Sequence, residues 1–143
     1  MLKNIPLIIG SELLKILSEM GHGDEIVIAD GNFPAASKAQ RLVRMDGHNA
    51  SEILESILKL FPLDQYVEKP VGLMQVMKGD NYIPTIWEDF RKIIIESKEY
   101  FNDFDYIEKF EFYRRAEKSY AIIASSEIAL YANIILKKGV ITF

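Results

Sequence analysis

Four consecutive apolar residues, Ile26–Ala29, form the stretch that most restricts how this chain can fold. A run this short, apolar and rich in β-branched side chains is typical of a strand buried on both faces. Such a strand lies inside a sheet that is covered on both sides, and in α/β proteins helices provide the cover. Asp30, Gly31 and Asn32 then break the strand.

Helical and strand patterns alternate along the rest of the chain. Apolar spacing predicts helices over 11–20, 49–61, 85–97 and 110–118, and short apolar runs predict strands over 41–45, 71–77, 120–124 and 131–136. Capping boxes are expected where Asn49 precedes Glu52 and where Thr85 precedes Glu88. No repeat or low-complexity linker divides the chain. We therefore predict one α/β domain over residues 1–143, a three-layer fold with a mostly parallel sheet and helices on both faces.

Composition excludes several functional classes. The net charge of the 143 residues is −4 and no Lys/Arg block exceeds a pair, which argues against nucleic acid or an anionic membrane surface as a partner. The chain has no cysteine, so disulfides, thiolate metal sites and cysteine nucleophiles are excluded. No stretch reaches the roughly 18 apolar residues of a membrane span, and the N-terminus lacks the apolar core of a signal peptide. We expect a cytoplasmic protein.

His22 stands alone between Gly21 and Gly23, just before the apolar strand. Two glycines allow positive φ on both sides of the histidine, which would turn the backbone sharply and push the imidazole out of the packed layers. Since histidine titrates near neutrality, it could exchange protons with a ligand, and Asp30 could orient it or hold a hydroxylated ligand. The alternative is that His22 caps the preceding helix and Asp30 merely begins a turn.

Other residue groups have both a structural and a functional interpretation. Met74 and Met77 are expected in the core rather than in a pocket, and His48 in a solvated turn. The aromatic and acidic segment 100–106 suits sugar stacking, although a loop docked on the core is the more common role of such a segment. With two histidines and no cysteine, we expect no metal. Asn133 in a buried strand needs hydrogen-bond partners, and a ligand is one candidate.

Several motifs, taken together and in order, resemble the family of the L-fucose mutarotases and D-ribose pyranases. They are Glu12-Leu13-Leu14-Lys15, Glu19–Glu25, Asp30 with Asn32–Ala35, Arg44 with Asp46-Gly47, and Tyr131-Ala132-Asn133 leading to Leu136–Val140. The resemblance spans nearly the whole chain. It implies a ring-shaped homo-oligomer, a decamer, that interconverts the α and β anomers of a free monosaccharide without a cofactor, with L-fucose as the first expected substrate.

The resemblance also assigns roles to single residues. It implies His22 as the catalytic acid/base, and as substrate contacts Asp30, Lys109, Tyr131, Ala132 and Asn133. Lys109 departs from the arginine or histidine expected there, and Ser126 replaces a glycine. The departures affect the choice of sugar rather than the chemistry, because lysine keeps a donor but loses the planar fork of arginine.

Three alternatives remain open at this stage: a non-catalytic sugar-binding or regulatory oligomer, a D-ribose-type pyranase, and a purely structural oligomer. We also hypothesise that subunits share the site, because Lys109 and Tyr131–Asn133 come some 80 to 110 positions after His22 and Asp30. The segment 100–106 offers surface suited to burial against a neighbour in a closed ring.

Overall fold

The computed structural model describes residues 1–143 and contains five helices and six strands, which alternate along the chain except that the last two strands are consecutive. The helices are α1 (Ser11–Glu19), α2 (Ala35–Lys38), α3 (Ala50–Leu58), α4 (Ile86–Ser97) and α5 (Lys109–Lys118). The strands are β1 (Glu25–Ala29), β2 (Leu42–Met45), β3 (Val71–Met74), β4 (Asp105–Ile107), β5 (Ala121–Ser125) and β6 (Ile134–Lys137).

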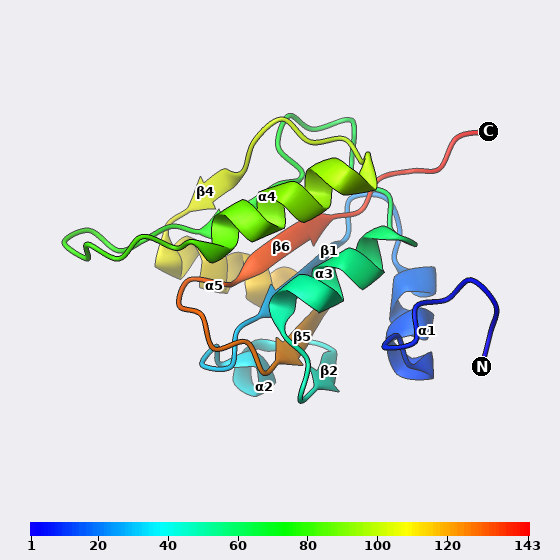
Figure 1. Ribbon diagram of the computed structural model, residues 1–143, viewed down its shortest axis with the longest axis horizontal. Helices are drawn as coiled ribbons and strands as arrows, with labels where there is room; N and C mark the ends of the chain where they lie inside the picture. Colours follow the sequence, from blue (N-terminus) through cyan, green and yellow to red (C-terminus); the bar gives the residue numbers. More distant parts are fainter.

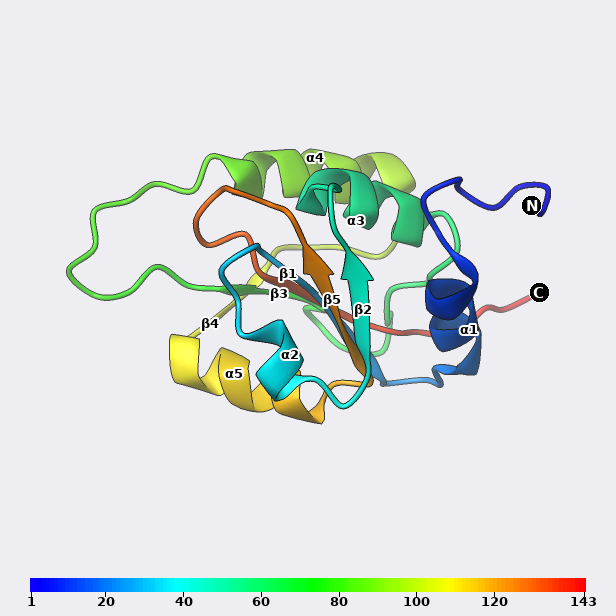
Figure 2. The same ribbon diagram turned by 90° about the horizontal axis from the view of Figure 1, so that it is seen from below.

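All six strands form one sheet in the order β2-β5-β1-β6-β3-β4. The pairs β1/β5, β2/β5 and β3/β4 are parallel, whereas β6 runs antiparallel to both β1 and β3. Helices α3 and α4 cover one face and α2 and α5 the other, while α1 lies at one end beside the chain termini (Figures 1 and 2). The predicted three-layer α/β fold with a mostly parallel sheet is confirmed.

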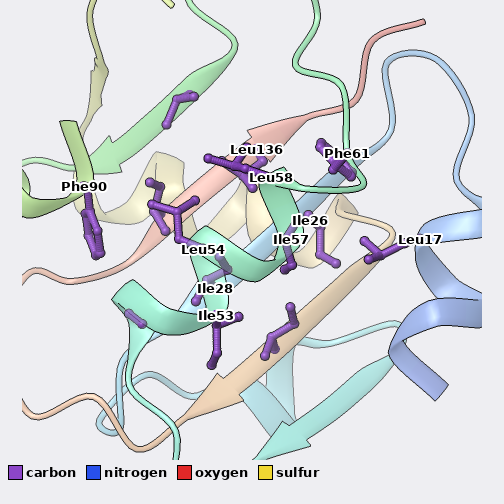
Figure 3. Packing of buried hydrophobic residues seen from close by; sticks show 14 of the residues in the cluster. Leu17, Ile26, Ile28, Ile53, Leu54, Ile57, Leu58, Phe61, Phe90 and Leu136 are labelled. Atoms are coloured by element: carbon purple, nitrogen blue, oxygen red, sulfur yellow. The ribbon is translucent and has the colours of Figure 1, made fainter. Parts of the chain in front are cut away.

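The central strand β1 is completely buried from Ile26 to Ala29, as its sequence predicts. Because side chains alternate across a strand, Ile26 and Ile28 enter the larger apolar core, whereas Val27 and Ala29 enter a smaller one. Figure 3 shows the larger core, in which apolar side chains of β1 and β6 lie against α3. Each face of the sheet thus has its own core under its own helices.

The strand directions place polar residues from distant segments at one edge of the sheet. Five strands run in one direction, so their carboxyl ends share this edge with the start of β6. Asp30 follows β1, Lys109 follows β4 and Asn133 precedes β6. The long β3–α4 loop projects beyond this edge, at the left of Figure 1. The carboxyl edge of such a sheet is the usual place for ligands in α/β proteins.

Several local predictions need correction. Two short elements were not predicted: residues 35–38 form the helix α2, and the segment 100–106, for which a docked loop is the more common role, leads into the strand β4. Thr85 makes no capping hydrogen bond, because its own backbone is already helical (φ −64°, ψ −25°). The predicted strand over 131–136 begins only at Ile134.

The other capping box forms as predicted. The Asn49 side chain accepts a hydrogen bond from the Glu52 N–H, and the Glu52 carboxylate accepts one from the Asn49 N–H. These bonds satisfy two of the free N–H groups at the start of α3. Every helix is too short or too polar to span a lipid bilayer.

Candidate functional site

A pocket of about 240 Å³ opens at the carboxyl edge of the sheet. The residues that line it come from four separate segments, which converge because of the strand order: Asp30, Asn32, Phe33, Met74, Met77, Asp80, Lys109, Tyr113, Leu130, Tyr131 and Asn133. Of the six site residues suggested by the sequence, four therefore meet in one pocket. Its mixture of charged, hydrogen-bonding and apolar groups suits a small hydroxylated molecule.

Asp30 is held at the base of this pocket by Asn133. The Asn133 Nδ2 donates to Asp30 Oδ2 at 3.1 Å, and the backbone N–H of Asp30 donates to Asn133 Oδ1 at 2.8 Å. The other carboxylate oxygen, Oδ1, accepts the N–H of Asn32 at 2.9 Å. Burial raises the pKa of the Asp30 carboxyl, and these hydrogen bonds oppose that effect without cancelling it.

Tyr131 enters the pocket from an unusual backbone conformation. Its φ of +56° lies in the left-handed region, which non-glycine residues rarely adopt, and the indole N–H of Trp87 donates to its carbonyl oxygen at 2.8 Å. The phenol donates to Asp80 Oδ2 at 2.7 Å and accepts the N–H of Met77 at 3.3 Å. The phenol–carboxylate bond lowers the pKa of Asp80 and raises the pKa of Tyr131.

Lys109 is the first residue of α5, and its ammonium lies 5.8 Å from the centre of the Phe110 ring and 5.7 Å from that of Tyr113. A cation in the first turn of a helix interacts unfavourably with the helix dipole, so Lys109 is expected to destabilise α5 slightly. Its ammonium instead supplies a donor at the rim of a pocket that contains Asp30 and Asp80.

Six of the eleven residues that line the pocket are apolar or aromatic. They include Phe33, Met74, Met77 and Leu130, and Tyr113 packs its ring edge-on against Phe33 at a centroid distance of 5.4 Å. Met74 is buried as predicted but also lines the pocket. The assignment of Met77 to the core is wrong, because 45% of this residue is exposed.

His22 lies at the opposite edge of the sheet, before β1 rather than after it. Of the two flanking glycines only Gly23 has positive φ (+87°), yet the imidazole does point out of the packed layers, with 46% of its side chain exposed. Its Nε2 lies 3.0 Å from Asp64 Oδ1, so its partner is a carboxylate rather than the last carbonyls of α1. Within one chain, about 13 Å of strand separates His22 from Asp30.

Three other residues singled out from the sequence, Ala132, His48 and Ser126, do not line the pocket and make contacts within the protein instead. Ala132 is completely buried in the larger core, so only its main chain could reach a ligand. His48 lies in a turn and its Nδ1 is 2.8 Å from Glu52 Oε1. The Ser126 hydroxyl, which stands where a glycine was expected, accepts the N–H of Gly47 at 2.8 Å and joins two loops at the carboxyl edge.

The segment 100–106 does not line the pocket. Phe104 is completely buried, Asp103 pairs with Arg91, and Tyr106 packs against Trp87. Its aromatic residues therefore serve mainly the core of their own chain, and Tyr106 keeps a 42% exposed surface.

No sequence pattern singled out Asp80 and Asp64, which contact Tyr131 and His22 respectively. Both follow a turn or strand end, where polar residues are common, and each meets its partner only through the fold. The structure contains no group of three or more histidine, aspartate or glutamate side chains arranged to hold a metal ion.

Comparison with known proteins gives consistent matches over nearly the whole chain. An L-fucose mutarotase of Actinobacillus pleuropneumoniae serotype 5b is 44% identical over 140 residues, which cover 98% of this chain and 97% of that protein. A crystal structure of the fucose mutarotase of Streptococcus pneumoniae in complex with L-fucose superposes with a TM-score of 0.92 at 51% identity, covering 99% and 100% of the two chains.

The structure of Bacillus subtilis RbsD complexed with D-ribose is less similar, with a TM-score of 0.77 and 25% identity over 99% of this chain and 100% of that one. Residues 3–141 match the sequence pattern of a single family. The chain therefore belongs to the RbsD / FucU transport protein family.

Proposed function

We infer that this protein is a sugar mutarotase, an isomerase that interconverts the α and β anomers of free L-fucose without a cofactor. The observation that carries the inference is the pocket at the carboxyl edge, where Asp30, Lys109 and Tyr131 converge in a family whose relatives include L-fucose mutarotases. The greater likeness to the L-fucose complex than to the D-ribose complex favours the deoxyhexose.

The pocket supplies the groups that a monosaccharide needs. Asp30 and Tyr131 offer oxygen acceptors for sugar hydroxyls, while Lys109 and the second amide hydrogen of Asn133 offer donors. L-Fucose carries a methyl group where ordinary hexoses carry a hydroxymethyl group. We place that methyl group against apolar lining residues such as Met74 or Leu130, because a hydroxyl placed there would lose its hydrogen bonds to water.

The reaction requires two proton transfers. One proton is removed from the anomeric hydroxyl and one is delivered to the ring oxygen, while the bond between the anomeric carbon and the ring oxygen breaks and an aldehyde forms. Rotation about the bond to the aldehyde carbon and reclosure then give the other anomer. An imidazole that exchanges protons near neutrality can serve both transfers, and we assign this role to His22.

His22 and the pocket of the same chain are too far apart to act on one sugar ring. We therefore propose that each site combines the pocket of one subunit with His22 of a neighbouring copy, in a ring-shaped homo-oligomer that the resemblance suggests is a decamer. A closed ring has heterologous interfaces, so every subunit can lend the same residue to the next. The half-exposed imidazole is consistent with such a role.

Saturation transfer between the anomer signals of L-fucose tests the activity directly, with D-ribose measured alongside. The wild-type protein should accelerate exchange, and His22→Ala should lose about 10² to 10⁴ of that acceleration. His48→Ala is the matched control, because it removes the only other histidine, which lies outside the pocket. Equal acceleration by the wild-type and His22→Ala proteins would contradict the acid/base assignment.

A non-catalytic sugar-binding oligomer is the second candidate, since the same pocket could bind without turnover. Binding of L-fucose that raises the unfolding temperature, without any acceleration of anomer exchange, would favour it. Light scattering, with activity measured across a dilution series, tests the shared site, because a folded and fully active monomer would exclude it. The cytoplasmic location stays a prediction that fractionation of expressing cells can check.

A further inference from the structure

Tyr66 is an exposed aromatic residue that lies beside His22. The residue is 68% exposed, and its ring centre is 5.5 Å from that of the imidazole, with 56° between the ring planes. Its ring has no other aromatic neighbour, and its phenol has no hydrogen-bond partner in the chain. Each of the other six tyrosines packs against an aromatic or cationic side chain or hydrogen-bonds through its phenol. Tyr66 therefore contributes little to the packing of its own chain.

The backbone at Tyr66 is nevertheless held in place. The Tyr66 N–H donates to Asp64 Oδ1 at 3.0 Å, and the Asp64 N–H donates to the carbonyl oxygen of Lys137 at 3.0 Å. The loop before β1 is tied to the adjacent carbonyl, that of Lys138, by the Gly23 N–H at 2.8 Å. The end of β6 thus sets the separation between the two loops. A ligand that meets the imidazole ring therefore also lies close to the phenol ring.

The pocket at the carboxyl edge is small for a ligand site. Its volume of about 240 Å³ is below the roughly 300 to 1,000 Å³ of most such sites, which bury most of the surface of their ligand. A further wall is needed to cover a monosaccharide held by Asp30 and Lys109. In the proposed shared site that wall comes from the neighbouring subunit.

A neighbour that lends His22 brings Tyr66 with it, because the two rings are 5.5 Å apart. We propose that Tyr66 is a sugar-binding residue: its ring, supplied by the same subunit as His22, packs against the C–H face of the monosaccharide in the next subunit's pocket. The C–H groups of a sugar ring carry partial positive charge and are attracted to the negative face of an aromatic ring. The contact also removes apolar surface from water. This inference rests on the proposed function, in which neighbouring copies share the site.

The role predicts a specific change in the kinetics. The Tyr66 ring touches the sugar but exchanges no proton with it, so it stabilises the bound sugar and the transition state equally. An interaction of this kind lowers KM without changing kcat. Loss of the ring should therefore weaken binding and leave kcat unchanged, in contrast to loss of His22.

The first experiment measures L-fucose affinity by calorimetric titration of the wild type, Tyr66→Phe and Tyr66→Leu. Tyr66→Phe keeps the ring and should retain the wild-type Kd, whereas Tyr66→Leu keeps an apolar side chain without the ring and should raise Kd about 3- to 10-fold. Tyr120→Leu is the matched control, because Tyr120 packs on Arg41, lies outside the pocket and should not affect Kd. An unchanged Kd in Tyr66→Leu would overturn the proposal. Equal losses in the Phe and Leu variants would also overturn it, because the phenol oxygen and not the ring would then bind the sugar.

The second experiment determines which subunit supplies the ring. In mixed rings of His22→Ala and Asp30→Ala subunits, an active site takes its histidine from the Asp30→Ala subunit and its pocket from the His22→Ala subunit. Tyr66→Leu added to the Asp30→Ala subunit should raise the KM of the recovered activity. The same change added to the His22→Ala subunit should leave KM unchanged. Equal KM values for the two placements would overturn the proposal.

The two experiments also separate this inference from the proposed function. Recovered activity with equal KM values leaves the proposed function intact and overturns the role of Tyr66. Mixed rings that recover no activity overturn the shared site and the role of Tyr66 with it. If the protein binds L-fucose without accelerating anomer exchange, the catalytic function fails, and the Kd of Tyr66→Leu still decides whether the ring binds sugar. Circular dichroism and native mass spectrometry of each variant verify that fold and assembly are retained.

Discussion

Asn133 and Asp30 are joined by two hydrogen bonds that run in opposite directions. The Asn133 amide donates to the Asp30 carboxylate at 3.1 Å and its oxygen accepts the Asp30 backbone N–H at 2.8 Å, although the residues are 103 positions apart. The pair joins the end of β1 to the start of β6. Asn133 was expected to contact a ligand, but in the structure its side chain makes both hydrogen bonds to Asp30 and thereby orients the Asp30 carboxylate.

The direction of these bonds predicts the outcome of exchanging the two side chains. Asp30→Asn turns an NH₂ group toward either the Asn32 N–H or the Asn133 amide, and Asn133→Asp sets two carboxylates against each other. Each single variant should lose about 1 to 3 kcal/mol of unfolding free energy. The double variant restores every donor–acceptor match, so it should recover most of that stability but not the activity, because the carboxylate has moved to position 133.

Urea unfolding of the four proteins gives the coupling energy between the two positions. A double variant that loses the sum of the two single losses would show that the bonds do not match as described. A double variant with wild-type activity would show that the carboxylate need not be at position 30.

Burial of Asp30 also predicts a pH dependence of stability. Because the folded-state pKa of Asp30 is raised, the folded protein binds this proton more tightly than the unfolded chain does. The Asp30 contribution to the unfolding free energy should be complete below the unfolded pKa and should fall as pH rises through the folded pKa. The difference between wild type and Asp30→Ala, measured from acid to neutral pH, should therefore decrease with pH.

Asp80 provides the opposite case for comparison. Its pKa is lowered by the Tyr131 phenol, so its contribution should be present above the unfolded pKa and lost as pH falls through the folded pKa. If the wild type minus Asp30→Ala difference instead grows with pH, as expected for Asp80→Ala, the assigned direction for Asp30 is wrong.

Tyr131 should bind sugar as a hydrogen-bond acceptor, because its own proton is committed to Asp80. Tyr131→Phe should weaken L-fucose binding by about 0.5 to 1.5 kcal/mol, the usual value of one hydrogen bond. Asp80→Asn should weaken it less and should add nothing in the Tyr131→Phe background. Calorimetric titration measures all four affinities, and additive losses would mean that Asp80 contacts the sugar itself.

The layers of the fold follow from local sequence patterns, and the site does so only in part. The buried run in β1 and the capping box at Asn49 involve residues close in sequence, so periodicity and spacing predicted them. Thr85 and Glu88 have the same spacing as a capping box, but the Trp87 N–H already bonds to the carbonyl of Pro84, so Thr85 lies within the first turn. Spacing alone cannot determine which residue is the first to leave the helix.

The contacts that complete the site depend on loops whose course no local pattern describes. Asp64 is 42 positions from His22 and Asp80 is 51 from Tyr131. Tyr131 was expected in a strand because it begins an apolar run. Its backbone is instead left-handed, which is incompatible with a strand, and its phenol contacts Asp80. The resemblance to a known family named four of the pocket residues, but it could not indicate which chain segments hold them in place.

Replacing Lys109 by methionine should lower the activity of the protein and raise its stability. Lys109→Arg keeps a donor and should retain activity with an altered preference among sugars, whereas Lys109→Met should lose activity. The same Lys109→Met change removes a cation from the first turn of α5 and should raise the unfolding free energy by about 0.3 to 1 kcal/mol.

Lys118→Met is the matched control for this effect, because Lys118 lies in the last turn of the same helix, where a cation is favourable. It should lower stability and leave anomer exchange unchanged. Equal activity of the Arg and Met variants of Lys109 on every sugar tested would remove Lys109 from the site.

Mixing inactive subunits gives the most direct test of a site shared between neighbours. His22→Ala and Asp30→Ala subunits should each be inactive, since every site in either homo-oligomer lacks one essential group. After dissociation and joint reassembly in equal amounts, about one quarter of the sites should combine an intact His22 with an intact pocket from the next subunit. Native mass spectrometry verifies that mixed rings form, and a His22→Ala subunit mixed with a His22→Ala/Asp30→Ala subunit is the control that should stay inactive. Mixed rings without recovered anomer exchange would show that His22 and Asp30 do not act from opposite sides of one interface.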